Sequence, residues 1–218
     1  MNFFGNLLEL VAAFSGFYYL KKYPDSSLRY FVYFLVITVF VDAVGSYTNF
    51  NFIRPERDTL FYENFWLYNT YVIVSLFFYI TFYYFQIQRK NLKNVLKFLV
   101  VISSFVITYI IYHEGEMFFK TNLKYLFICT TFSVFLCVAF YFYEVLMSDK
   151  ILVFYRSALF YISIGLLLWW LIFPLLIFYM PYFKEIYPGL VRKVGIILVW
   201  TNIYLYGCYT FGFLWGKE

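Results

Sequence analysis

Long runs of apolar residues alternate with short polar joints along the whole chain. The apolar windows lie at about 3–20, 30–49, 62–86, 95–112, 122–147, 157–180 and 190–215. Most of them reach the length of about 20 residues that an α-helix needs to cross a hydrocarbon layer of roughly 30 Å. The pattern therefore predicts an all-α fold, a polytopic membrane bundle of about seven transmembrane helices in a single integral membrane domain spanning residues 1–218.

The joints between these windows carry charged residues, prolines and glycines, which end apolar helices. They lie at 21–27, 51–58, 88–93, 113–116, 148–150 and 181–188. None is long enough to fold as a separate domain. The sequence shows no internal repeat, so the repeated architecture of many transporters is not indicated.

Composition supports a membrane protein and excludes several other classes. Hydrophobic residues make up 64% of the chain and charged residues 13%, whereas soluble domains are about half apolar and a quarter charged. The amino terminus lacks a basic segment and a cleavage site, so the first window is expected to remain as a helix. The basic residues behind the formal charge of +5 sit at window ends, which argues against nucleic acid as a partner.

Orientation follows from the basic residues in alternate joints, because cytoplasmic joints of membrane proteins collect Lys and Arg. The larger share of the 17 basic residues falls on the side that holds Lys21, Lys22, Arg89 and Lys90. This asymmetry predicts that the amino terminus lies outside and the carboxyl terminus in the cytoplasm.

Three polar residues in different windows share a similar depth. Glu9, Asp42 and Asn69 each lie about 10 Å below the outer boundary, at a rise of about 1.5 Å per residue. Their similar depth predicts an outward-facing pocket for a ligand, an ion or a proton, with Tyr68 and Asn202 as further members.

A purely structural interpretation of these polar residues stays open. An ionisable residue at the centre of a membrane helix costs at least about 2.5 kcal/mol on insertion, so it faces the bundle interior with a partner. A neutral carboxyl that hydrogen-bonds to an asparagine or a tyrosine of a neighbouring helix would simply hold helices together.

Other features carry weaker expectations. Glu144 lies close to the cytoplasmic end of its window, where Lys150 or Arg156 is expected to pair with it. Pro174 lies inside the sixth window and is expected to kink the helix. Gly212 and Gly216 have the spacing of small residues at helix contacts, although they could simply close the last helix.

The sequence gives no indication of catalysis, a metal site or a cofactor. His113 is the one histidine of the chain and lies beside two glutamates in a short joint, a solvated turn rather than a metal site. The three cysteines fall inside apolar windows without metal-ligand spacing. No nucleophile and base arrangement of an intramembrane hydrolase is present, so an enzyme is not expected.

Several short motifs together resemble a family of small membrane proteins. They include Glu9, Asp42, Tyr68-Asn69 and Glu144, the segment from Ala158 to Pro174, and Asn202 with Gly212-Phe-Leu-Trp. The chain resembles an uncharacterised seven-helix membrane protein family of Bacteroidota, especially flavobacteria, although Phe160-Tyr161 stands where that family commonly has Phe-Trp. The resemblance implies a multi-pass protein of the bacterial plasma (inner) membrane without catalytic residues.

Two functions are compatible with this pattern. The first is a non-enzymatic sensor or interaction subunit, embedded in the lipid bilayer, that reports through a membrane or cytoplasmic protein partner. The second is a transporter or an oligomeric pore, for example a homo-oligomeric effector of a bacterial defence system. A pore needs polar residues through the whole membrane thickness, whereas Glu9, Asp42 and Asn69 occupy its outer third, which favours the sensor.

Overall fold

The computed structural model describes residues 3–48 and 64–217, and it confirms the all-α prediction. The helices are α1 (Phe3–Lys22), α2 (Arg29–Thr48), α3 (Phe65–Gln86), α4 (Lys90–Glu114), α5 (Lys124–Leu146), α6 (Ala158–Ile186) and α7 (Pro188–Trp215). Short 3₁₀ helices lie at η1 (Gly115–Phe119), η2 (Asp149–Leu152) and η3 (Phe154–Arg156). No β-strand occurs within these described ranges; the joint predicted at 51–58 lies outside them.

The chain is a multi-pass membrane protein. Five helices in the described residues are long and apolar enough to cross a membrane, at 65–86, 90–119, 124–146, 158–180 and 189–215. Their outward faces carry large apolar side chains such as Phe105, which is 73% exposed. Such surfaces suit hydrocarbon, because hydrophobic residues exposed to lipid incur no hydration cost. α1 and α2 have 20 residues each, about 30 Å of helix, and the full set of seven spans stays a prediction.

Two helix boundaries differ from the sequence prediction. α4 begins at Lys90, so its first turns include basic residues that the prediction had left in a joint. α6 continues to Ile186 and α7 starts at Pro188, so most of the joint predicted at 181–188 is helical. A proline at the first position of a helix loses no hydrogen bond, because that N–H has no partner inside the helix. The charged residues Lys184 and Glu185 lie in the last turn of α6 and do not end the helix before Ile186.

The chain divides into two compact units. The first unit comprises residues Met1–Val36 and Val145–Glu218, with α1, the start of α2, α6 and α7. The second unit comprises residues Ile37–Glu144, with the rest of α2, then α3, α4, η1 and α5.

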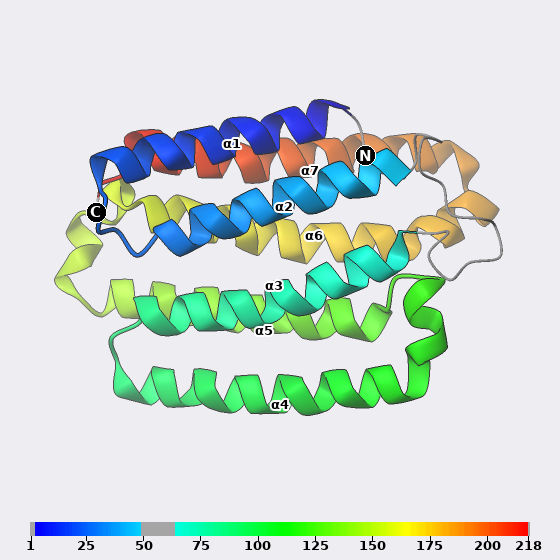
Figure 1. Cartoon of the computed structure of the whole chain (residues 1–218), viewed down its shortest axis with the longest axis horizontal. Helices are drawn as coiled ribbons and strands as arrows, with labels where there is room; N and C mark the ends of the chain where they lie inside the picture. The colour runs from blue at the N-terminus through cyan, green and yellow to red at the C-terminus, as the bar shows by residue number, and fades with distance from the viewer. Residues whose placement is uncertain (1–2, 49–63, 218) are drawn as a thin grey trace. The chain divides into compact units, whose positions relative to one another are not determined.

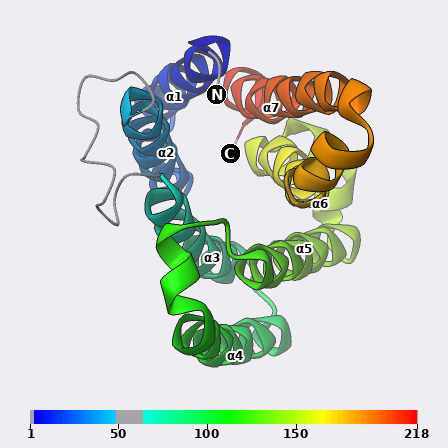
Figure 2. The same cartoon turned by 90° about the vertical axis from the view of Figure 1, so that its right-hand side faces the viewer.

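In the first unit, α7 packs against both α1 and α6 (Figures 1 and 2). Glycines permit the close approach of α6 and α7: a Cβ atom at Gly165 would lie 3.0 Å from Cys208 Cβ, and one at Gly212 would lie 3.0 Å from the Ala158 carbonyl oxygen. Gly216 also faces Ala158. The two glycines of the small-residue motif therefore serve a contact within the chain.

The directions of α1 and α7 follow from two contacts. Glu9 contacts Tyr206. Further along both helices, the rings of Tyr19 and Phe213 lie 5.7 Å apart. Because both contacts advance together in residue number, α1 and α7 run parallel.

In the second unit, α3 packs against α4 and η1 (Figure 2). The rings of Tyr83 and Tyr141 join α3 to α5 with centroids 6.1 Å apart. Leu76, Ile80 and Leu96 are almost wholly buried. The apolar contacts among these helices form the core of this unit.

Candidate functional site

Glu9 is a buried carboxyl that links the first and last helices of the chain. Its exposed fraction is 0%, on the seventh residue of α1. The Tyr206 hydroxyl of α7 donates a hydrogen bond to Oε1 of Glu9 at 2.9 Å. The contact joins residues 197 positions apart in the sequence, so it forms only when α1 and α7 pack together. A carboxyl held in this way can bind a proton or a cation.

Asn202 lies one turn before Tyr206 on α7. Its Oδ1 accepts a hydrogen bond from the Trp169 indole nitrogen of α6 at 2.7 Å. Residues four positions apart lie on neighbouring places of one helix surface. α7 therefore makes two neighbouring side-chain hydrogen bonds, one to α6 through Asn202 and one to α1 through Tyr206.

Asp42 lies between two contacts of α2 with α3 in the second unit, and one of them involves Tyr68. On α2, Thr38 and Gly45 flank Asp42 at helical spacing on one face. The Thr38 hydroxyl lies 2.7 Å from the Tyr71 hydroxyl of α3, and Gly45 leaves room for the Tyr68 hydroxyl. Asp42, only 9% exposed, therefore faces α3 between these two contacts.

Asn69 uses its side-chain amide to hold the connection between η1 and α5. Its Nδ2 donates to the carbonyl oxygens of Phe118 and Thr121, both at 2.8 Å, and its Oδ1 accepts from the Leu123 N–H at 3.2 Å. The side chain is 0% exposed. Both donor hydrogens and the acceptor of this amide thus serve backbone groups, which gives Asn69 a structural role.

Glu144 binds the amino-terminal end of α4. Its carboxylate accepts hydrogen bonds from the Gln88 N–H at 2.8 and 2.9 Å and from the Arg89 N–H at 3.1 Å. These amides precede α4, where the helix dipole favours a negative charge. Sequence reasoning had expected a basic side chain as the partner of Glu144 and had no signal for these backbone amides.

The two basic residues expected near Glu144, Lys150 and Arg156, belong to the first unit. Arg156 is exposed in the first unit, and its guanidinium lies 5.5 Å from the ring centroid of Tyr155. The Arg156 carbonyl accepts a hydrogen bond from the Lys217 N–H at 2.6 Å. The side chain of Lys150 lies outside the described residues. Pairing of either residue with Glu144 stays a prediction.

Pro174 lies within α6. α6 continues through Pro174 without interruption, and the kink stays a prediction. Among the described residues, no group of three His, Cys, Asp or Glu side chains could hold a metal ion. Sequence reasoning missed Tyr206 and Trp169, because aromatic residues are so abundant in this chain that no single one stands out.

The five residues predicted for one pocket thus fall into two sets. Glu9 and Asn202 belong to the first unit, where Glu9 bonds to Tyr206, one turn from Asn202 on α7. Asp42, Tyr68 and Asn69 belong to the second unit. No protein-family model, curated protein or solved structure matches the chain.

Proposed function

We propose that this chain is a non-enzymatic integral protein of the bacterial inner membrane that acts as a sensor or interaction subunit, with Glu9 as its input. The observation that carries the proposal is the burial of this carboxyl against the Tyr206 hydroxyl. An ionisable side chain at membrane depth is costly and marks a functional site by default. Glu9 lies about 9 Å along α1, at a rise of about 1.5 Å per residue.

Binding of a proton or a cation at Glu9 changes the strength of its bond to Tyr206. A hydrogen bond to an ionised carboxylate is roughly twice as strong as one between neutral groups. The state of Glu9 therefore changes the energy with which α1 is held against α7. A sensor requires such a difference in interaction between its two states.

The first unit also offers a route to an output. Further along α1 and α7, Tyr19 and Phe213 remain in ring contact. Just past the end of α7, the Lys217 N–H bonds to the Arg156 carbonyl. A shift of α7 therefore displaces the η3 segment, where the Arg156 side chain is exposed. In the proposed orientation this end is cytoplasmic, and a membrane or cytoplasmic protein partner would receive the signal there.

The sensor is preferred over a transporter because the polar side chains of the first unit form isolated hydrogen bonds between pairs of helices. Glu9 bonds to Tyr206 and Asn202 to Trp169, whereas a conducting path needs polar groups along the full length of a helix bundle. The seven spans, the outside amino terminus and the cytoplasmic carboxyl terminus are parts of the same proposal.

Proton flux into proteoliposomes tests the choice between these functions. The purified protein would be reconstituted with a pH-sensitive dye trapped inside, and wild type compared with Glu9→Gln and Asp42→Asn under an imposed gradient. The proposal expects vesicles that stay tight with all three proteins. Flux that is present in wild type and lost in Glu9→Gln would overturn the sensor in favour of transport.

A further inference from the structure

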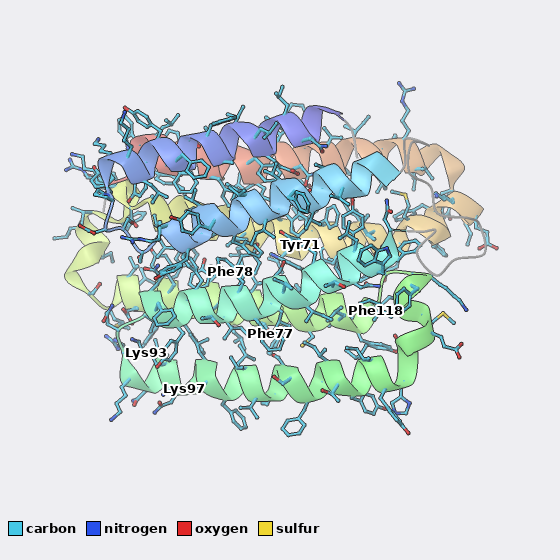
Figure 3. The ribbon with its side chains drawn as sticks, viewed as in Figure 1. Tyr71, Phe77, Phe78, Lys93, Lys97 and Phe118 are labelled. Carbon is cyan, nitrogen blue, oxygen red and sulfur yellow. The ribbon has the colours of Figure 1, made fainter. Side chains whose placement is uncertain are left out.

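A cluster of basic side chains occupies the start of α4. Arg89, Lys90, Lys93 and Lys97 lie within nine consecutive positions. The ammonium groups of Lys93 and Lys97 lie 5.2 and 5.7 Å from the ring centroid of Tyr84. Figure 3 shows both lysines near one end of α4, far from Phe118 in the same unit.

Two members of this cluster, Lys93 and Lys97, carry charges that no acid in the described part of the unit neutralises. Among the described residues, no carboxylate forms an ion pair with Lys93 or Lys97. Glu144, which lies beside the start of α4, directs its oxygens to the backbone amides of Gln88 and Arg89. The lysines instead stack on Tyr84, which leaves their positive charge available to an external anion.

A shallow groove continues along α4 from the lysines. It has a volume of about 260 Å³ and is lined by Val100, Val101, Ser104, Phe105 and Thr108. Val101 and Phe105 follow Lys97 at intervals of four residues, so the groove and this lysine share one helix face.

The two hydroxyls in the groove are satisfied within the helix. Ser104 donates to the Val100 carbonyl at 2.8 Å, and Thr108 donates to the Ser104 carbonyl at 2.9 Å. Neither hydroxyl therefore needs a polar partner from outside, and the groove presents an apolar surface.

We propose that this end of α4 is a binding site for an anionic phospholipid. The phosphate of the lipid lies against Lys93 and Lys97, and one acyl chain follows the groove past Val101 and Phe105. α4 is one of the helices long and apolar enough to span the membrane, so its first turns lie where lipid headgroups are found. Each Lys near an anionic membrane surface strengthens binding by about fivefold. A basic head site continuous with an apolar groove matches a lipid better than a free anion.

Lipid titration of the whole protein tests this site. The full chain would be placed in nanodiscs of phosphatidylcholine, and phosphatidylglycerol bound per protein measured by native mass spectrometry. The double variant Lys93→Gln with Lys97→Gln should bind phosphatidylglycerol at least about tenfold more weakly than wild type. The matched control, Lys120→Gln with Lys124→Gln, removes the same charge between η1 and the start of α5 and should bind like wild type.

Equal binding by both double variants and wild type would overturn the proposal, as would equal losses in both. Inorganic phosphate should not displace the lipid, and displacement at equal concentration would show a free-anion site instead. Val101→Trp separates the groove from the charge, because it fills the groove and leaves both lysines. It should weaken binding of long-chain phosphatidylglycerol and leave a short-chain form unaffected, and equal effects on both would overturn the acyl-chain assignment.

Discussion

The Tyr206 hydroxyl donates a hydrogen bond to the Glu9 carboxyl at 2.9 Å and joins the last helix of the chain to the first. Removing either partner leaves the other buried without this bond. Tyr206→Phe and Glu9→Leu should each destabilise the protein by about 1 to 2 kcal/mol. The double variant should cost less than the sum of the two, as expected for residues in contact. Denaturation in mixed micelles, arranged as a double-mutant cycle, measures the coupling, and additive effects would show that the bond carries no energy.

Asn69 should be the most sensitive polar position of the second unit. Asn69→Ala removes three hydrogen bonds to the backbone of residues 118–123, and each buried group left without a partner costs about 1 to 3 kcal/mol. Asn69→Asp keeps the acceptor for Leu123 but sets a buried carboxylate oxygen against the two carbonyl oxygens, so its loss of stability should be at least as large. The exposed Asn94→Ala serves as the control and should be near neutral. Thermal unfolding in detergent measures the stability of these variants. An Asn69→Ala variant as stable as wild type would refute the structural role of Asn69.

Glu144→Gln should loosen the start of α4. The substitution keeps an acceptor and removes the charge, with an expected loss of about 0.5 to 1 kcal/mol from the helix dipole. Amide hydrogen exchange at Gln88 and Arg89 should accelerate. Glu114 ends α4, where a negative charge opposes the dipole, so Glu114→Gln should leave these amides unchanged. Identical exchange in the two variants would show that Glu144 does not hold this end.

Alanine substitutions at two glycines of α7 should have opposite effects on the stability of the protein. Gly212→Ala places a Cβ atom 3.0 Å from the Ala158 carbonyl and 3.1 Å from Tyr161 Cβ, so it should destabilise the protein by about 1 to 3 kcal/mol. Gly207→Ala meets nothing within 4 Å and should stabilise the helix by up to about 1 kcal/mol. The mass of the particle in detergent should be the same for both. A change in oligomeric state with Gly212→Ala would assign the motif to a contact between chains.

The apolar pattern predicts the helices better than it predicts the joints between them. Every predicted window coincides with a helix to within a few residues at most boundaries, because an apolar run of that length has few alternatives in a membrane. The charged residues at 184–185 were misleading, since they lie inside α6 near its end and do not break it. Helix ends are set by capping and packing, which short polar stretches only partly encode.

The partners of the buried polar residues could not be predicted from sequence. The depth of Glu9 indicated burial, but its bond to Tyr206 depends on the packing of helices nearly 200 positions apart. Asn69 and Glu144 bind backbone groups, which every residue possesses, so no sequence pattern marks those partners. Sequence position gives the depth of a polar side chain, while its partner depends on helix packing.

The distance between α1 and α7 gives the most direct test of Glu9 as the input of a sensor. Spin labels at the lipid-facing positions Phe14 and Phe211, in a background without native cysteines, would report this distance in proteoliposomes by pulsed electron paramagnetic resonance. The account predicts a longer and broader distance distribution at about pH 4 than at about pH 9 in wild type, because protonation weakens the bond from Tyr206. Glu9→Gln should give one distribution at both pH values. A wild-type distribution that does not respond to pH, or a response that persists in Glu9→Gln, would contradict the account.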